Sequence, residues 1–461
     1  MRPHPNADRM LLADCFGNTV CVGLDAQEED VILYFPTDGQ LSKEYAEINN
    51  LIRIKNEDGT YSGGYLDPDK RNIKAIKLRG EKSDGLVMPL ESLSSFGDIS
   101  TLNIGNTINV FNGHEICKKY IPRENPMKVR AGGNKTRKTK RLIAPLFKEH
   151  ADTEQLAYNL DAFKAGDEIE ITLKMHGTSQ RTAYLPKLIG YKRSILDRLL
   201  KREGTPIYDW GYVSGTRRTV VDDFENRTTS FYGSDAFREP HAKMFEGKLY
   251  KGETVYYEVV GFTDNGTPIM GSCDNRKTQD KEFIKKYGEV TTFSYGCDCA
   301  EQAWRENRGQ DPDKPQSDIY VYRMTMTNED GYVMELTPDY MRYRCEQMGV
   351  KTVPVMWKGY IPYTVDDIDS TIPGHRIILR EGENAGDWVK SVAEQYYDGP
   401  DPIGRTHVRE GVVVRIINRP KFAAYKHKNF SFKVLEGIVK ADALMPDMEE
   451  AQETIDESSE I

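Results

Sequence analysis

The sequence has 461 residues with a formal net charge of -9, and 38% of the residues are hydrophobic. No apolar run approaches the roughly 18 residues that a membrane-spanning helix needs, which excludes an integral helical membrane protein. No apolar stretch follows the first positive charges, so the pattern of a secretory signal peptide is absent and a cytoplasmic location is expected. Seven scattered cysteines do not form the pattern of a disulfide framework.

The first 122 residues have the pattern of a small β-barrel domain, in which short β-branched and aliphatic runs alternate with turn residues. One short helix is expected at Glu44–Leu51. The segment His4–Met10 resembles the start of tRNA-binding oligonucleotide-binding (OB) barrels, and the alternative interpretation is an ordinary loop entering a strand. The expected strands are Thr19–Leu24, Val31–Pro36, Ile73–Leu78, Leu86–Leu90 and Thr107–Phe111.

Charge is unevenly distributed over the rest of the chain. Residues 123–143 read as a linker, in which Arg123–Arg141 holds eight basic residues and one acidic residue. Such a segment either gains phosphate contacts on a nucleic acid or is simply solvated. A second domain is expected over 144–444, with a helix beginning near Asp152–Glu154, followed by an acidic tail at 445–461. Removing the seven negative charges of Pro446–Ile461 changes the net charge from -9 to -2.

The segment Glu168–Ser179, EIEITLKMHGTS, places a lysine at the end of a strand. Its apolar residues alternate onto one face, and the strand is expected to end at Lys174 before a turn at Gly177. A lysine amine normally titrates near ~10.4, and it becomes nucleophilic at neutral pH only when burial or nearby cations lower its pKa. A single lysine of this kind is more often a surface residue before a turn, so the rest of the chain decides its meaning.

Four further segments carry groups that a nucleophilic lysine needs at a phosphate-transfer site: arginines, carboxylates and paired lysines. They are Val213–Arg218, with two arginines after a strand; Val255–Gly261, with Glu258 inside a strand; Glu410–Arg415, with a carboxylate before a strand; and Tyr425–Lys428, with two lysines on one strand face.

In order and content these segments resemble the covalent nucleotidyltransferases, and among them the RNA ligases of the Deinococcus and Naegleria type. In that family the lysine of motif I takes AMP from ATP, and KMHGTS, which contains Lys174, fits this motif. VSGTRRT resembles motif Ia, YYEVVGF motif III, IYVYRM motif IIIa, EGVVVR motif IV and YKHKNFSFK motif V. Each motif alone is weak, whereas six in the expected order form a specific signal over nearly the whole chain.

The resemblance implies an α+β fold, with an N-terminal OB-like barrel followed by a nucleotidyltransferase domain of antiparallel sheets and flanking helices. It also implies the roles of individual residues. Lys174, Lys426 and Lys428 are the implied catalytic residues. The implied ATP-binding residues are these three lysines together with His176, Gly177, Arg217, Glu258 and Tyr322. Glu410 is the implied ligand of Mg²⁺ or Mn²⁺.

The activity implied by the resemblance is ATP-dependent RNA ligation. Lys174 would form a lysyl-AMP, the AMP would pass to an RNA 5′-phosphate, and a 3′-OH would then displace it to form a phosphodiester bond. The expected partner is RNA with 3′-OH and 5′-phosphate ends, such as a nicked duplex, and the expected process is RNA repair.

The chain departs from the family pattern at three places. Glu258 and Glu410 are 152 positions apart, longer than this catalytic core requires, so Asp264–Ser317 and much of Thr337–Pro402 are interpreted as embellishment. Motif Ia offers adjacent arginines, of which Arg217 is preferred to its neighbour. Motif IIIa offers two tyrosines at positions 320 and 322, and Tyr322 is chosen as the residue that stacks on adenine.

Two other functions remain open from the sequence. One is another covalent nucleotidyltransferase, such as a DNA ligase or a capping guanylyltransferase, but these place an OB domain after motif V, whereas 33 residues follow Lys428 here. The other is a non-catalytic RNA-binding protein, which would have no use for a nucleophilic lysine, two separated carboxylates and a paired-lysine strand together.

Overall fold

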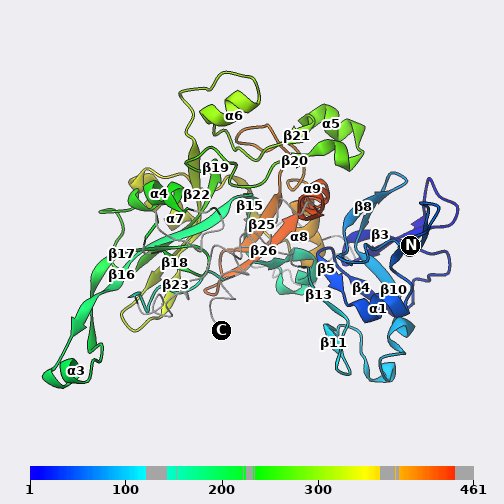
Figure 1. Cartoon of the computed structure of the whole chain (residues 1–461), viewed down its shortest axis with the longest axis horizontal. Helices are drawn as coiled ribbons and strands as arrows, with labels where there is room; N and C mark the ends of the chain where they lie inside the picture. Colours follow the sequence, from blue (N-terminus) through cyan, green and yellow to red (C-terminus); the bar gives the residue numbers. More distant parts are fainter. Residues whose placement is uncertain are drawn as a thin grey trace. The chain divides into compact units, whose positions relative to one another are not determined.

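The computed structural model describes residues 1–120, 143–151, 153–221, 223–224, 232, 234–363, 379 and 384–441 (Figure 1). The basic segment Arg123–Arg141 and the acidic tail 445–461 lie outside these residues, so their expected roles stay predictions. The chain divides into two compact units. The N-terminal unit comprises Met1–Pro122 and Phe430–Ala441, and the main unit comprises Arg123–Asn429 and Asp442–Ile461. In the described part of the chain, no helix is long and apolar enough to span a bilayer.

The N-terminal unit is built from short strands around an apolar core, and every strand expected from the sequence has a shorter counterpart. Helix α1 (Lys43–Ile48) begins where the Ser42 side chain accepts the Tyr45 backbone N–H, a standard N-cap. The strands are β1 (Arg2–Pro3), β2 (Leu11–Cys15), β3 (Asn18–Val22), β4 (Ile32–Phe35), β5 (Gly39–Leu41), β6 (Arg53–Lys55), β7 (Tyr61–Gly63), β8 (Ala75–Leu78), β9 (Glu81–Asp84), β10 (Leu86–Pro89), β11 (Val110–Phe111), β12 (His114–Glu115) and β13 (Cys117–Lys119).

The expected barrel is present only as separate antiparallel pieces. Within residues 1–120 the strands form six small sheets, of two or three strands each, and do not join into one closed barrel. The strands are only two to five residues long, and each except β2 pairs with a single neighbouring strand. Tight turns such as Asn112–Gly113, with φ values of 47° and 84°, return the chain at once to the strand that it has just left.

Helix α9 (Phe430–Ala441) belongs to the N-terminal unit although it lies near the end of the chain. The Lys433 Nζ atom lies 2.5 Å from Oδ2 of Asp84 in β9. The Lys82 Nζ atom lies 5.3 Å from the centre of the Phe430 ring, and Phe432 and Leu435 are buried. The sequence placed these residues in the 144–444 domain, whereas their contacts complete the unit formed by the first 122 residues.

A five-stranded sheet of the main unit has the order β14-β26-β25-β15-β24. Its strands are β14 (Glu154–Gln155), β15 (Glu168–Lys174), β24 (Val355–Tyr360), β25 (Gly411–Ile416) and β26 (Ala423–Lys428), all antiparallel except the β14–β26 pair. The alternating apolar residues of β15 and β25 pack together with α8 (Ala385–Glu394) in one buried core. In place of the α-helix expected to begin near Asp152–Glu154, the described residues Glu154 and Gln155 pair with β26, and two short 3₁₀ helices follow at Leu156–Tyr158 and Leu160–Ala162.

A six-stranded antiparallel sheet has the order β18-β17-β16-β19-β22-β23. Its strands are β16 (Thr178–Lys192), β17 (Thr205–Gly215), β18 (Val220–Val221), β19 (Glu253–Gly261), β22 (Ser317–Thr327) and β23 (Val333–Glu335). Figure 1 shows β16 and β17 as a long hairpin with α3 (Ile195–Leu199) at its tip. The apolar stripe of Tyr191–Glu203, with basic residues opposite, predicts a docked surface helix here, but the apolar side chains of Ile195 and Leu199 are 78% and 74% exposed.

Buried charges connect the two sheets. Glu335 of β23 accepts hydrogen bonds from Arg323 of β22 and from Arg415 of β25, at 2.8 and 2.9 Å. Arg342, in α7 (Pro338–Met348), donates to Glu170 of β15 at 2.8 Å. All these carboxylates have a cationic partner, which offsets the cost of removing them from water. The polar face of β15 and β25 is therefore fixed against the six-stranded sheet, while the opposite face is apolar.

Two buried histidines, His241 and His407, and the half-buried His150 predict how stability depends on pH. Burial lowers the pKa of His241 to about 4 and also lowers the pKa values of His150 and His407. An unfolded histidine titrates near ~6.5, so below that pH the unfolded chain binds more protons than the folded one. We expect the free energy of unfolding to fall as the pH drops from 7 to 5. Urea titrations at several pH values measure this slope, and His241→Gln should make it shallower; an unchanged slope would contradict the assignment.

Candidate active site

Lys174 lies at the point where three neighbouring strands of the five-stranded sheet end. The register pairs Lys174 of β15 with Gly411 of β25, and Gly411 with Lys428 of β26. Gly411 has a φ of 150°, and a Cβ atom there would lie 2.1 Å from the carbonyl oxygen of His427. Only glycine therefore permits this close approach of β25 and β26. The sequence-predicted strand end at Lys174 is confirmed, and the register brings motifs I, IV and V together.

Glu410, which precedes β25, is the centre of the charge cluster. Its Oε1 atom lies 2.6 Å from Nζ of Lys174 and 3.6 Å from Nζ of Lys428, and its Oε2 atom lies 3.5 Å from Nδ1 of His176. The Glu410 side chain is 1% exposed. Burial alone would raise its pKa, but Lys174, His176 and Lys428 outweigh burial and lower the pKa to about 2. Glu410 is therefore a carboxylate anion at neutral pH.

Lys426 and Lys428 are two residues apart in β26, so both side chains leave the same face of the sheet as Lys174. Lys426 pairs with Val413 of β25, two residues from the pair formed by Lys428 and Gly411. The backbone N–H of Asn429 donates to the Glu410 carbonyl oxygen at 2.8 Å, which fixes the end of β26 against the start of β25. This end of the face therefore presents three lysines close to the Glu410 carboxylate.

The turn after Lys174 runs close to β19. A Cβ atom on Gly177 would lie 2.7 Å from the Val259 carbonyl oxygen and 3.3 Å from Oε2 of Glu258. The register also pairs Ser179 of β16 with Glu258 of β19. Only glycine fits at position 177, because any larger residue would collide with β19. The turn places His176 beside Glu410, and Glu258 lies beside the start of β16. The predicted strand around Glu258 is confirmed as β19.

Tyr322 of β22 lies beside the same strands. Its hydroxyl is 3.0 Å from the Ser179 hydroxyl, and its ring centroid is 5.3 Å from that of His150. Burial raises the pKa of Tyr322, the Glu258 carboxylate raises it further, and Arg217 lowers it. Glu258 and Arg217 are thus both within electrostatic range of Tyr322. These contacts gather the chosen residues of motifs Ia, III and IIIa, whose roles stay predictions.

The alternatives of motifs Ia and IIIa occupy different surroundings. The Arg218 carbonyl oxygen accepts a hydrogen bond from the buried guanidinium of Arg181 at 3.3 Å. The Tyr320 ring is buried and lies 5.7 Å from Nζ of Lys351. Arg217, by contrast, influences the pKa values of both His150 and Tyr322. The register pairs Glu258 with Tyr320, whereas the Glu258 carboxylate raises the pKa of Tyr322, so the choice of Arg217 and Tyr322 stays a prediction.

The residues of the cluster fit a nucleotide and a divalent cation to different degrees. Three lysines on one sheet face suit phosphate oxygens, and the glycine at position 177 leaves the backbone close to β19. Among the residues that the structure describes, no group of three or more His, Cys, Asp or Glu side chains is arranged to hold a metal ion. Glu410 thus offers a single carboxylate, a donor set that fits Mg²⁺, which keeps most of its waters and binds substrate phosphates.

Sequence reasoning missed two residues that touch the turn after Lys174. The Tyr295 hydroxyl accepts the backbone N–H of His176 at 2.7 Å, and the Phe293 ring meets the His176 ring edge-on at 4.6 Å. Both come from the segment Asp264–Ser317, which was interpreted as embellishment. No motif marks them, because their position depends on a contact across 119 residues of sequence.

Comparison with solved structures finds the same fold in Naegleria gruberi RNA ligase. A lysine-to-alanine variant of that ligase with ATP and Mn aligns with a TM-score of 0.52 at 14% identity, over 94% of this chain and 95% of the ligase chain. A lysine-to-methionine variant with AMP and Mn gives a TM-score of 0.51 at 13% identity over the same shares. No protein-family model matches the sequence, and no curated protein does. The likeness establishes an RNA ligase-like fold over almost the whole chain.

Proposed function

We propose that this protein is an ATP-dependent RNA ligase that joins 3′-OH and 5′-phosphate RNA ends, acting in RNA repair in the cytoplasm. The observation that carries the proposal is the row formed by β15, β25 and β26, in which the Nζ atoms of Lys174 and Lys428 lie 2.6 and 3.6 Å from Oε1 of Glu410. The RNA ligase-like fold supports the same activity. A carboxylate, a strand-end lysine and further lysines form the set that nucleotidyl transfer to lysine requires.

In the first step, the neutral amine of Lys174 attacks the α-phosphorus of ATP. A P–N bond forms, the bond to the pyrophosphate oxygen breaks, and the amine loses a proton, leaving a lysyl-AMP and pyrophosphate. Lys426 and Lys428 offset the negative charge of the α-phosphate and favour the neutral form of Lys174. The Glu410 carboxylate, 2.6 Å away, favours the protonated form. A bound divalent cation supplies positive charge that competes for this carboxylate.

In the later steps, an oxygen of the RNA 5′-phosphate attacks the lysyl-AMP, and Lys174 leaves as the amine. The RNA 3′-OH then attacks the adenylated end, and AMP leaves as the phosphodiester bond forms. Glu258 and Tyr322, which both lie beside Ser179, and Arg217, which lowers the pKa of Tyr322, are proposed to hold the ribose and adenine during the first step. The N-terminal unit and the basic segment Arg123–Arg141 are proposed to contact RNA phosphates, because the segment concentrates eight cations.

One experiment separates the three candidate functions. The full chain is incubated with Mg²⁺ and either α-labelled ATP or α-labelled GTP, and the label on the protein is measured after denaturing electrophoresis. Label from ATP alone supports the ligase proposal, and sealing of nicked RNA rather than nicked DNA then identifies the substrate. Label from GTP alone indicates a capping-type enzyme. No label from either nucleotide contradicts a covalent nucleotidyltransferase and leaves an RNA-binding protein.

Glu410→Gln tests the proposed cation site. The amide keeps the shape of the side chain but removes the negative charge that holds Mg²⁺, so we expect lysyl-AMP formation to require a higher Mg²⁺ concentration and to be slower at saturation. The measurement is the rate of labelling across a Mg²⁺ titration. Glu301→Gln is the control, because Glu301 lies in α6 (Ala300–Arg305) and pairs with the exposed Arg305. Identical titrations for both variants would remove Glu410 from the metal site.

A further inference from the structure

The segment Asp264–Ser317 reaches the turn that carries the proposed nucleophile. The Tyr295 hydroxyl accepts the backbone N–H of His176 at 2.7 Å, two residues after Lys174. The Phe293 ring packs edge-on against the His176 ring, with centroids 4.6 Å apart and an interplanar angle of 80°. Phe293 and Tyr295 are 4% and 2% exposed, so these contacts are made inside the protein. The segment therefore contacts both the backbone and the side chain of His176.

The buried His407 ring packs against both the Phe293 ring and the Tyr295 ring. The His407 ring lies 5.1 Å from the Phe293 ring and 4.6 Å from the Tyr295 ring, centroid to centroid. His407 and the neighbouring Asp401 are completely buried, and Asp401 accepts the backbone N–H of Gly404 at 2.6 Å. The loop 401–408 is thus closed on itself and forms a fixed base under Phe293 and Tyr295.

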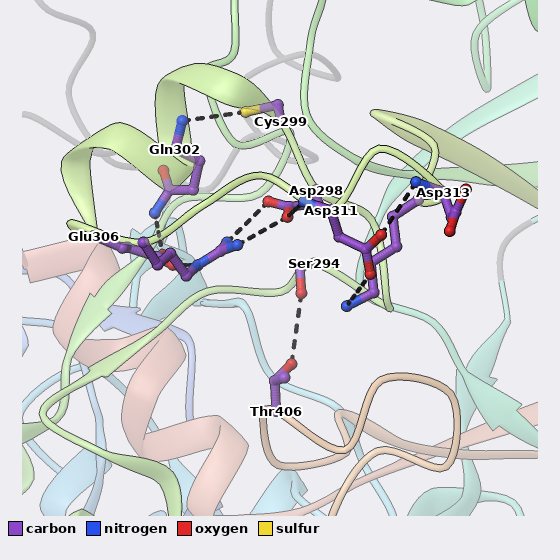
Figure 2. Close-up of polar contacts among 10 residues, drawn as sticks. Ser294, Asp298, Cys299, Gln302, Glu306, Asp311, Asp313 and Thr406 are labelled. Carbon is purple, nitrogen blue, oxygen red and sulfur yellow. Dashed lines mark hydrogen bonds and ion pairs between the residues drawn. The ribbon is translucent and has the colours of Figure 1, made fainter.

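The segment has internal bonds of its own around this contact. Figure 2 shows that Ser294 points toward Thr406, which belongs to the loop 401–408. The two hydroxyl oxygens are 3.5 Å apart. Figure 2 also shows Asp298 beside Asp311. The buried Asp298 carboxylate accepts two hydrogen bonds from Arg308, at 2.8 and 2.9 Å, and one from the backbone N–H of Asp311 at 3.0 Å. These bonds fix the chain immediately after Tyr295.

The backbone of Tyr295 adopts a conformation that tyrosine rarely adopts. Its φ is 48°, in the left-handed region, which costs free energy for a residue with a Cβ atom and persists only where the surroundings impose it. This conformation lets the hydroxyl reach the His176 amide. Burial and the carboxylates of Glu410, Asp401 and Glu258 raise the pKa of Tyr295 well above its ordinary value, so the hydroxyl stays neutral.

We propose that Tyr295 is a positioning residue for Lys174, acting through His176 and Glu410. The contacts form a continuous series: Tyr295 holds the His176 amide, His176 lies 3.5 Å from Glu410, and Glu410 lies 2.6 Å from Lys174. The inference rests on the proposed function, since Lys174 needs positioning only if it attacks a phosphate. It gives Asp264–Ser317 a role in the first chemical step, where the sequence indicated only embellishment.

Tyr295→Phe tests the proposal, because it keeps the ring and removes only the hydroxyl. The matched control is Tyr212→Phe, since the Tyr212 hydroxyl also accepts a backbone N–H, that of Gly247, at 2.6 Å. We expect the single-turnover rate of lysyl-AMP formation at saturating ATP to fall by about 10- to 100-fold in Tyr295→Phe, with an unchanged half-saturating ATP concentration. The control should form lysyl-AMP at the wild-type rate.

Amide hydrogen exchange of the full chain without nucleotide provides a readout independent of activity. The peptide containing Met175, His176 and Gly177 should exchange faster in Tyr295→Phe and at the wild-type rate in Tyr212→Phe. Phe293→Leu, which removes the ring edge against His176 and keeps the apolar volume, should act in the same direction. This second variant replaces the first if Tyr295→Phe fails to fold.

The outcomes separate this proposal from the proposed function. A wild-type labelling rate in Tyr295→Phe, or an equal loss in both tyrosine variants, overturns the positioning role. A loss confined to the half-saturating ATP concentration also overturns it, because that result indicates nucleotide contact. If the wild-type chain forms no lysyl-AMP, the proposed function fails and hydrogen exchange alone decides: faster exchange in Tyr295→Phe supports its hold on the turn, and unchanged exchange overturns it.

Discussion

Replacing Lys174 with alanine is expected to reduce covalent labelling by α-labelled ATP to the background level. Alanine has no amine to attack the α-phosphorus, and Lys428, whose Nζ lies 3.6 Å from Glu410 compared with 2.6 Å for Lys174, is proposed to offset phosphate charge and not to attack. The measurement is label retained on the protein after denaturing electrophoresis. Ligation of RNA that already carries a 5′-adenylate should persist, because that substrate does not need the lysyl-AMP.

Lys174→Arg separates loss of the nucleophile from loss of the charge. Arginine keeps a cation beside the buried Glu410 carboxylate, whereas alanine leaves this carboxylate with one fewer partner. We expect both variants to lose labelling, and we expect alanine to lower the thermal unfolding midpoint more than arginine does. Lys285→Ala, which alters an exposed lysine in α5 (Lys281–Tyr287), is the control and should label normally. Retained label in either Lys174 variant would exclude this residue as the nucleophile.

Lys428→Ala is expected to slow lysyl-AMP formation by about 100- to 1,000-fold, the range seen when one preorganised donor is removed from a site of developing charge. Lys428 shares the Glu410 carboxylate with Lys174, at 3.6 and 2.6 Å. Its removal takes away a cation that offsets phosphate charge and that favours the neutral Lys174 amine. Lys426→Ala should have a similar effect. Single-turnover labelling with ATP measures both rates.

Two further variants make the Lys428 experiment specific. Lys428→Arg keeps the positive charge and should recover part of the lost rate. Lys421→Ala alters an exposed lysine shortly before β26 and should leave the rate unchanged. If Lys426→Ala and Lys428→Ala both label at the wild-type rate, motif V does not contribute to the phosphate site.

The strand ends of the candidate site could be predicted from the sequence because each depends on a local pattern. Alternating apolar residues fixed the face of β15, and the β-prone run after Glu410 fixed β25. Residues two positions apart on a strand point to the same face of the sheet, so the spacing of Lys426 and Lys428 predicted that both side chains share one face. The local patterns therefore predicted the separate strands, whereas the family resemblance implied that Lys174, Glu410 and Lys428 share one site.

Long-range pairing could not be predicted in the same way. The contact between Tyr295 and His176 spans 119 positions, and no periodicity in Asp264–Ser317 points to it. The closed barrel expected for the first 122 residues also depends on pairing between distant strands, and the short ladders there do not join. At the tip of β16 and β17, the apolar stripe of Tyr191–Glu203 predicted burial, but Ile195 is 78% exposed.

The assignment of α9 to the N-terminal unit has a consequence for the order of events during translation. Residues 123–429 are synthesised between the two parts of that unit, and this takes roughly 15 to 60 s at typical elongation rates of about 5 to 20 residues per second. During this interval Lys82 and Asp84 have left the ribosome without Phe430 and Lys433. Lys428 and helix α9, which completes the N-terminal unit, are therefore synthesised within seconds of each other. A product that ends before Lys428 lacks both the lysine and the helix.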